Sequence, residues 1–363
     1  MYRYRVRLQP EWTLQAPDGT SLPPKLMQLL HGIRETGTLA AACVECGLSY
    51  RYAWGVVQQA EALLGAPLLS STRGRGARLT ALGERLVWAD RRIAARLSPT
   101  FDSLASEIEV ELERVLHAPQ APLRIHATHG FAVETLRRFL DRAEMPVDLK
   151  YRGSDEVLAA RRADGCDIAG MHLPVGELER EILEHYAARL DRTRDRVVHL
   201  ASRRQGLILA PGNPRGVRAL ADLLRPDLRV VLRQPGSGTR LLFERLLARQ
   251  GMDVGRLNAC DTQEMTHAAV AAYVASGMAD VGFGLETPAR RYGLGFVPVL
   301  SEHYFFLCDV DALERPHLRA VVATLRSERF RREVNDLPGY DASLCGSVQT
   351  LERAFPSARR VLR

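Results

Sequence analysis

A glycine-rich turn between a short apolar strand and an amphipathic helix constrains the fold of this chain more than any other stretch. Residues 228–232 have the composition of a buried strand, and residues 241–247 have the apolar spacing of a helix. Between them the chain passes through Gly236, Ser237, Gly238, Thr239 and Arg240. The N–H groups of a first helical turn are unpaired and the helix dipole is positive there, so this turn is suited to hold a small anion.

A simpler interpretation of the turn needs no ligand. A hydroxyl such as that of Ser237 can cap the helix, and the glycines can serve turn geometry alone. Arg240 or Arg233 can neutralise an anion, but an arginine on the first helical turn often pairs with an acidic side chain instead. Both interpretations require a strand, a turn and a helix in succession, which is the local unit of an α/β fold.

Short apolar strands alternate with helices throughout the chain from residue 123 onward, as in other α/β domains. Residues 123–127 are predicted to form a strand, which is followed by Thr128-His129-Gly130 and a helix through residue 140. Residues 163–170 and 276–284 each close a helix and open a strand, so they form a weak internal repeat. Two similar halves indicate two lobes, and the space between lobes is a natural ligand site.

The first hundred residues follow a different, helical pattern. Apolar residues share one face between residues 26 and 33, and two further short helices are predicted at residues 39–46 and 50–64. Thr38 and Ser49 are placed to cap these two helices. Two short helices joined by a glycine-containing turn predict a helix-turn-helix, and residues 67–79 predict a hairpin behind it.

Basic residues are concentrated in this part of the chain. The formal net charge of the whole chain is +7, and residues 49–96 hold eight arginines against three acidic residues. Arg73, Arg75 and Arg78 lie in an acid-free loop at the predicted hairpin. Such a patch is expected of a nucleic-acid contact, although a solvated basic face is the alternative.

Three further expectations concern the flanks of the helix-turn-helix. Residues 2–16 alternate apolar and polar side chains and predict a strand pair. Trp54 lies one helical turn from Tyr50 and is predicted to belong to the core. Residues 86–115 predict a long amphipathic helix with a kink or restart at Pro99. Its apolar seam favours a dimerisation helix, and packing against its own domain is the alternative.

Three ordered motifs in residues 22–90 resemble the DNA-binding domain of ModE-type molybdate-responsive regulators and, more distantly, that of LysR-type regulators. The motifs are residues 37–42, residues 47–54 and the Gly/Arg-rich hairpin closed by residues 79–84. The resemblance implies a winged helix-turn-helix that places the start of its third helix in the major groove. The residues expected to contact DNA are Thr38, Ser49, Tyr50, Arg51, Gln58, Arg73, Arg75 and Arg78.

Residues from about 123 to 346 resemble the type II periplasmic-binding-protein fold in its form fused to regulators. The motifs that carry the resemblance are residues 205–214, 233–240, 266–284 and 337–341. The resemblance implies a cleft closed by strand-to-helix turns from both lobes, where relatives hold molybdate, tungstate, phosphate or sulfate. The residues expected to contact an effector are Thr128, His129, Gly130, Ser154, Gly236, Ser237, Gly238, Thr239, Arg240, Thr266 and His267.

The first turn of the cleft departs from molybdate-binding proteins, because it offers Thr128-His129-Gly130 in place of consecutive serines. This leaves room for smaller or less symmetric anions such as formate. His129 and His267 can donate to an anion or act as ordinary core or capping residues. His172, which follows a predicted strand, is a weaker candidate of the same kind.

The predicted organisation has three parts: a winged helix-turn-helix at residues 1–82, a linker and dimerisation helix at 83–117, and a two-lobed α/β domain at 122–363. Lobe I comprises about 122–204 and 297–363, and lobe II about 205–296. These parts predict a one-component transcription regulator with three partners: a double-stranded DNA operator, a small anionic effector such as molybdate, tungstate or formate, and a further copy of the chain, as a dimer or a tetramer.

Other function classes are less well supported by the sequence. An enzyme of anion or cofactor metabolism with a DNA-binding head is one alternative, but no nucleophile–base pair, metal-ligand cluster or Walker-type sequence points to catalysis. No cofactor or metal is expected. A scavenging binding protein would need an export signal, whereas the N-terminus lacks an apolar core and no run is long enough for a membrane span. The expected location is the cytoplasm, where the six scattered cysteines would stay reduced.

Overall fold

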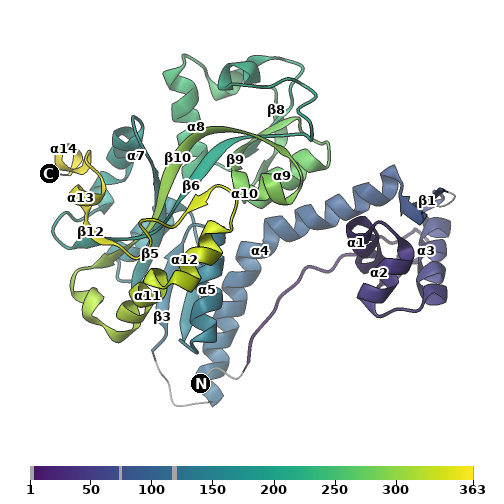
Figure 1. Ribbon diagram of the computed structural model, residues 1–363, viewed down its shortest axis with the longest axis horizontal. Helices are drawn as coiled ribbons and strands as arrows, with labels where there is room; N and C mark the ends of the chain where they lie inside the picture. The colour runs from purple at the N-terminus through teal and green to yellow at the C-terminus, as the bar shows by residue number, and fades with distance from the viewer. Residues whose placement is uncertain (1–3, 73–75, 117–120, 363) are drawn as a thin grey trace. The chain divides into compact units, whose positions relative to one another are not determined.

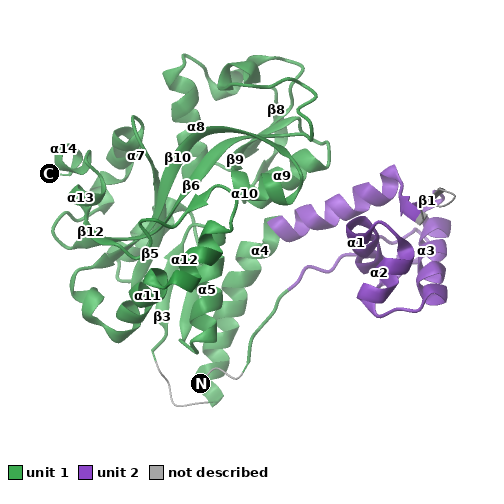
Figure 2. Ribbon diagram, viewed as in Figure 1, with its two compact units in different colours: residues 1–8, 96–363 green, residues 9–95 purple. Residues whose placement is uncertain are grey.

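The computed structural model describes residues 4–72, 76–116 and 121–362. The chain divides into two compact units, one formed by residues 9–95 and the other by residues 1–8 together with 96–363 (Figure 2). Arg73 and Arg75 lie outside the described residues. None of the described helices combines the length and apolar character needed to cross a membrane.

The smaller unit is a helix-turn-helix followed by a hairpin. It contains α1 (Leu26–Thr36), α2 (Leu39–Cys46), α3 (Tyr50–Leu64) and the antiparallel strands β1 (Leu69–Thr72) and β2 (Gly76–Leu79). The hydroxyl of Thr38 accepts the N–H of Ala41 at 3.1 Å, and the hydroxyl of Ser49 accepts the N–H of Tyr52 at 3.3 Å. The predicted caps and the predicted hairpin are therefore confirmed.

Two predictions in this region are wrong. Residues 4–14 form no strand, and only an isolated bridge joins Gln15 to Ser21. The reason is that the N–H of Val6 donates to the carboxylate of Glu109 at 3.0 Å and not to a neighbouring strand. Trp54 is not in the core, because its side chain is 39% exposed. The buried face of α3 consists of Ala53, Val56, Val57 and Ala60, and Trp54 projects away from it.

A single helix, α4 (Ala81–Leu116), runs through Pro99 without a break. The hydroxyl of Ser103 donates to the carbonyl of Pro99 at 2.7 Å and accepts the N–H of Tyr151 at 2.9 Å. Ser106 accepts the N–H of Leu149 at 2.8 Å. These contacts satisfy backbone groups on the free edge of a strand, so tertiary packing holds the helix together across the proline.

The division between the units falls inside α4, after Ala95, whereas the sequence placed a domain boundary at residues 82 and 83. The difference has a packing cause. Leu86 and Val87 on the first turns of α4 are buried in the core of the smaller unit. The first part of the helix therefore belongs structurally to the helix-turn-helix.

The larger unit is built on one continuous sheet with the strand order β4-β3-β5-β10-β6-β9-β7-β8, and two short strands pair with β6 (Figure 1). Its strands are β3 (Leu123–Ala127), β4 (Val147–Tyr151), β5 (Ile168–Pro174), β6 (Asp195–Leu209), β7 (Val230–Arg233), β8 (Ala259–Glu264), β9 (Val281–Leu285), β10 (Gly295–Asp309), β11 (Tyr340–Asp341) and β12 (Val348–Thr350). The outer strands β3 with β4 and β7 with β8 are parallel, and β6 with β10 is antiparallel.

The long strands β6 and β10 pass through both lobes and join them. Strands β3, β4 and β5 form lobe I on one side of this pair, and β7, β8 and β9 form lobe II on the other. The helices that cover the lobes are α5 (Phe131–Arg142), α6 (Ser154–Arg162), α7 (Glu179–Tyr186), α8 (Gly238–Arg249), α9 (His267–Ala275), α10 (Glu286–Arg291), α11 (Pro316–Arg326), α12 (Glu328–Asn335), α13 (Leu351–Ala354) and α14 (Ala358–Val361).

Each lobe is a sheet with helices on both faces. In lobe I, α5, α11 and α12 pack on one face (Figure 1), and α6, α7, α13 and α14 pack on the other. In lobe II, α8 covers one face, and α9 and α10 cover the other. The predicted fold class, a helical winged helix-turn-helix followed by a two-lobed α/β domain, is thus confirmed.

Candidate anion site and DNA-binding face

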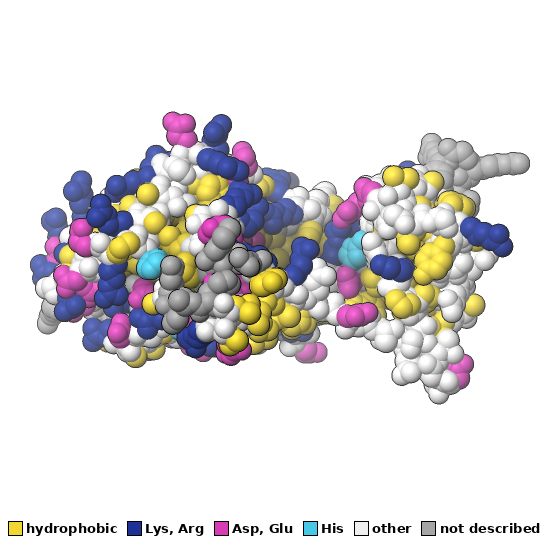
Figure 3. Space-filling view, turned by 90° about the horizontal axis from the view of Figure 1, so that it is seen from below, with side chains coloured by type: hydrophobic (Ala, Val, Ile, Leu, Met, Phe, Trp, Pro, Cys, Tyr) yellow, Lys and Arg dark blue, Asp and Glu magenta, His cyan; other side chains and the backbone are white. Residues whose placement is uncertain are grey.

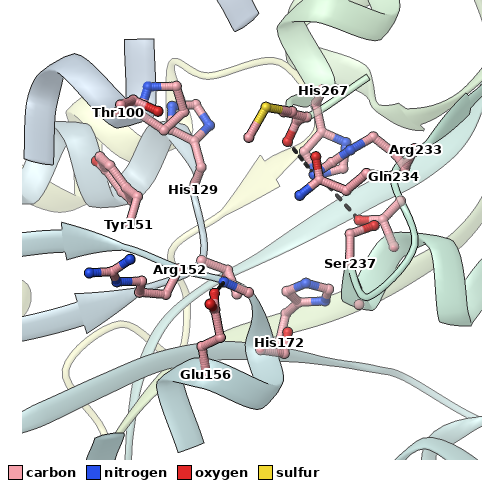
Figure 4. Close-up of a pocket in the computed structure, with 17 residues that line it drawn as sticks. Thr100, His129, Tyr151, Arg152, Glu156, His172, Arg233, Gln234, Ser237 and His267 are labelled. Carbon is pink, nitrogen blue, oxygen red and sulfur yellow. Dashed lines mark hydrogen bonds between the residues drawn. The ribbon is translucent and has the colours of Figure 1, made fainter. Parts of the chain in front are cut away.

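A cavity of about 250 Å³ lies between the two lobes of the larger unit (Figure 4). Lobe I contributes Thr128, His129, Tyr151, Arg152, Gly153, Ser154, Glu156 and His172; lobe II contributes Arg233, Gln234, Ser237, Gly238, Thr239, Met265 and His267. Pro99 and Thr100 of α4 complete the wall. The cavity is therefore lined by both lobes and by the helix that continues into the smaller unit.

The N-terminal ends of four helices meet at this cavity. The lining residues include the start of α6, α8 and α9 and the two residues that precede the cap of α5. Gly238 allows the turn of lobe II to approach lobe I, since a Cβ there would lie 2.9 Å from the ring of His172. Four positive helix ends around one cavity favour a negatively charged ligand.

Arg233 is the one lining arginine that lobe II contributes, and backbone carbonyls hold it in place. Its Nε donates to the carbonyl of Glu264 at 3.1 Å and its Nη2 to the carbonyl of Met265 at 2.6 Å. No carboxylate among the described residues lies within ion-pair distance of Arg233. Burial and the charge of Arg203 lower the pKa of Arg233 to about 10, so the guanidinium stays charged at neutral pH.

His267 is fixed as a neutral hydrogen-bond donor toward the cavity. Its Nδ1 accepts the N–H of Leu285 at 3.3 Å, so the proton of the neutral ring is on Nε2. Nε2 lies 3.4 Å from the hydroxyl of Thr239. Burial lowers the pKa of His267 well below its usual value, and the nearby arginines act in the same direction.

His172 and His129 are each held by a carboxylate. Nδ1 of His172 lies 2.9 Å from Glu302, whose other oxygen accepts Nε of Arg203 at 2.6 Å. Burial raises the pKa of Glu302, but the charges of Arg203 and His172 outweigh burial and lower it to about 2. Nε2 of His129 lies 2.8 Å from Glu134. Both carboxylates orient a ring at the cavity without entering it.

The structure brings together seven of the eleven residues that the sequence predicted for the effector site. The seven that line the cavity are Thr128, His129, Ser154, Ser237, Gly238, Thr239 and His267. The other four, Gly130, Gly236, Arg240 and Thr266, do not line it and have local roles.

The local roles explain why these four residues are outside the cavity wall. Arg240 pairs with Glu244 at 2.5 Å, so the ion-pair interpretation applies to it. Thr266 caps α9 through its hydroxyl, and Gly236 adopts a positive φ of 78° in the turn. Gly130 makes space for Arg203, whose Nη1 would lie 2.8 Å from a Cβ at that position.

Sequence reasoning missed several wall residues and underestimated His172. Tyr151 ends the parallel strand β4 and Arg152 follows it, ahead of α6, and that position at the carboxyl end of a strand was a usable signal. Pro99 and Thr100 carried no such signal, since nothing local places a linker helix at the cleft. Arg203 and Glu302 lie on the crossing strands, and only the fold brings them to His172.

The predicted DNA-binding residues that the structure describes lie on the smaller unit. Tyr50, Arg51, Gln58 and Arg78 are exposed. Ser49 is exposed as well, but its hydroxyl caps α3, and Thr38 caps α2. Arg73 and Arg75 lie outside the described residues, and contacts of all eight with DNA remain predictions.

Comparison with protein families gives two matches. Residues 137–326 match the PBP superfamily domain. Residues 24–84 match the bacterial regulatory helix-turn-helix protein, lysR family.

Three curated relatives are similar over parts of their length. The uncharacterized protein YvgK of Bacillus subtilis is 29% identical over 60% of this chain and 70% of its own length. The molybdenum-pterin-binding protein MopB of Rhodobacter capsulatus is 31% identical over 40% of this chain and 56% of its own. The transcriptional regulator CbbR of Xanthobacter flavus is 28% identical over 67% of this chain and 65% of its own.

Two solved structures are also similar. OxyR of Corynebacterium glutamicum is 16% identical over 93% of each chain, with a TM-score of 0.41. Full-length BenM is 13% identical over 86% of this chain and 96% of its own, with a TM-score of 0.43.

Proposed function

The chain belongs to the PBP superfamily through its larger unit. Because its helix-turn-helix matches the lysR family, we propose that it is a LysR-type transcriptional regulator whose cleft binds a small anion. The bound anion changes the affinity of the regulator for its operator. Both lobes and α4 contribute to the cavity wall. A ligand that fills the cavity therefore contacts both lobes and α4 at once.

The observation that carries the proposal is the environment of Arg233. The side chain is held by two carbonyl groups, has no carboxylate within ion-pair distance among the described residues, and lies where helix N-termini meet. A charged group so placed gains from an anionic partner, because each charge-assisted hydrogen bond contributes about 1.5–3 kcal/mol. The neutral Nε2–H of His267 offers a further donor.

The size of the cavity restricts the candidates. About 250 Å³ corresponds to roughly eight water molecules at their liquid volume of about 30 Å³. A tetrahedral oxyanion such as molybdate or tungstate fits with some water, and formate or a larger carboxylate fits too. The similarity to a molybdenum-pterin-binding protein favours testing the molybdenum oxyanion first.

The test is a thermal-shift screen of the full chain against sodium molybdate, tungstate, sulfate, phosphate and formate, followed by calorimetry with each anion that stabilises the protein. Thr239→Val keeps the shape of a buried side chain and removes one hydroxyl, so it should weaken binding about ten-fold or more. Arg240→Ala is the matched control, since Arg240 pairs with Glu244 outside the cavity. Stabilisation by no anion, or wild-type affinity in Thr239→Val, contradicts the proposal.

The geometry of His267 also argues against catalysis at the same cleft. The approach of Thr239 to His267 resembles a nucleophile beside a base. However, a base must have a free nitrogen lone pair, and the Nε2 that faces Thr239 carries the proton. The proposed role of the cleft is therefore binding without reaction.

We also propose that α4 pairs two copies of the chain. Its outer face carries an apolar row at helical spacing, Leu104, Ile108, Leu112 and Val115, with exposed fractions between 36% and 83%. The opposite face, with Ala105, Ser106 and Glu109, is buried. One face of the helix thus packs on its own domain, while another exposes a row of apolar side chains. This arrangement is expected of a helix that also packs against a second copy of the chain.

Replacing both Leu104 and Ile108 with glutamate should lower the mass measured by light scattering from that of an oligomer to that of one chain. Leu344→Glu is a matched control, since Leu344 is similarly exposed, at 39%, and lies outside α4. If the double variant is folded and its mass is unchanged, the proposal that α4 pairs two copies of the chain is contradicted.

A further inference from the structure

We infer that Tyr50 and Trp54 on α3 recognise thymine in the operator through its 5-methyl group. The inference rests on DNA binding by the helix-turn-helix and is independent of the anion site. According to this inference, two aromatic rings help to select the DNA sequence, in addition to the polar contacts expected of a recognition helix.

The two rings form a ridge on the outside of α3. Tyr50 is 55% exposed and Trp54 is 39% exposed. They are four residues apart, one turn of helix, and their rings stack with centroids 6.4 Å apart and planes 6° from parallel. The face of α3 that packs in the core is formed by other residues, all small or aliphatic. Large apolar rings left in solvent next to a functional surface indicate an external partner.

The charges around the ridge fit a polyanionic partner. Arg51, Gln58 and Gln59 are exposed on α3 beside the rings. The helix has a single acidic residue, Glu61, and its carboxylate accepts the N–H groups of Leu68 and Leu69 at 2.7 and 3.1 Å. Since Glu61 is used inside the unit, the outer face of α3 presents no carboxylate to repel phosphate groups.

Gly55 leaves room for a partner to approach the helix closely. It lies in the middle of α3, it is exposed, and a Cβ built on it would have no heavy atom within 4 Å outside its own helix backbone and neighbours. A glycine inside a helix is unfavourable relative to alanine, and none of the described residues lies where it would clash with a Cβ at this position. It lies on the floor of a groove that Arg51, Tyr52 and Gln59 also line. The glycine therefore keeps the helix surface low in this groove.

The chemistry of the major groove selects the target. Base edges there carry hydrogen-bond donors and acceptors, and the methyl group of thymine is the apolar feature among them. The ring faces of Tyr50 and Trp54 have no polar atoms to match a donor or an acceptor. Contact with a methyl group buries this apolar area without loss of hydrogen bonds, and among the base edges of the major groove thymine supplies that group. In the space-filling view, apolar and basic side chains lie side by side on the surface of the smaller unit, at the right (Figure 3).

The test removes the methyl group alone. Duplexes that bind the full-length protein are selected from a random pool, and each thymine of the selected site is replaced in turn by deoxyuridine. In the wild type, replacement at one or two positions per half-site should lower the affinity three- to ten-fold. In Trp54→Ala the same replacement should change the affinity less than two-fold. Leu14→Ala, as the control, should keep the wild-type dependence on the methyl group, since Leu14 is similarly exposed, at 40%, and lies outside α3.

Trp54→Leu, which keeps an apolar side chain, should retain part of the discrimination, and unfolding curves of all variants should match the wild type. Equal affinity of the wild type for thymine and deoxyuridine duplexes at every position overturns the inference. So does a Trp54→Ala variant that still discriminates. If the selection yields no bound duplex at all, DNA binding itself is refuted, which is a separate result.

Discussion

Replacement of Gly55 by alanine should make the smaller unit more stable and at the same time a weaker DNA binder. The position is exposed in the interior of α3, and a Cβ there meets nothing within 4 Å outside its own helix. Alanine is favoured over glycine at such a position by about 0.8–1.0 kcal/mol. With no clash to oppose it, most of this difference should appear as folding stability.

The expected gain is large enough to measure. For a domain of roughly 60–100 residues, 1 kcal/mol shifts the midpoint of thermal unfolding by about 4–8 °C. The unfolding transition of the smaller unit should therefore move upward by several degrees in calorimetry. The added methyl group should prevent the closest approach of the bases and weaken operator binding about ten-fold. The salt dependence of binding should stay the same, because no phosphate contact is lost.

Gly65→Ala serves as the control for the stability measurement. Gly65 ends α3 with a positive φ of 64°, so alanine there is strained and should lower the midpoint. A lower midpoint for Gly55→Ala would refute the assignment of open space around Gly55. Unchanged operator affinity would refute its role in close approach to DNA.

Three further changes test the larger unit and the wing. Burial and the neighbouring His303 lower the pKa of His199 to about 4, below the value of about 6.5 in the unfolded chain. The contribution of His199 to folding stability is therefore complete above pH 6.5 and is lost as the pH falls toward 4. In urea unfolding at several pH values, His199→Leu should make the stability depend less on pH across this range. A Cβ at Gly206 would lie 2.1 Å from the carbonyl of Val297, so Gly206→Ala should destabilise the crossing strands by about 3 kcal/mol or more in the same assay. Arg78→Ala should reduce the salt slope of DNA binding by about one unit if it contacts a phosphate, which filter binding at several salt concentrations would show.

Features that depend on a few neighbouring residues could be predicted from the sequence. Thr38, Ser49 and Ser237 all cap helices where the pattern placed them. A cap needs only a hydroxyl and the N–H groups two or three residues later. The strand-turn-helix around Gly238 was predictable for the same reason, and with it the part of the cavity wall formed by Ser237, Gly238 and Thr239.

Features that depend on distant residues could not be predicted. His172, Arg203 and Glu302 lie on three different strands, and only the pairing of those strands makes them one network. For Trp54 the local pattern was misleading. Its apolar side chain at helical spacing predicted a place in the core, but the buried residues of α3 lie on another face of the helix. The continuity of α4 through Pro99 likewise depends on Ser103, whose contact with Tyr151 lies outside any local window.

The crossing strands also determine the order in which the larger unit can form during its synthesis. Lobe II is continuous in the chain, whereas lobe I needs β10, which begins at Gly295, to pair with β5, which ends at Pro174. While the ribosome makes the residues between them, β5 has an unpaired edge, and the finished domain buries all seven of its residues. An open apolar edge invites pairing with other chains. The nascent regulator is thus most prone to aggregate in the interval before β10 leaves the ribosome, and slow elongation in that interval would prolong the exposure.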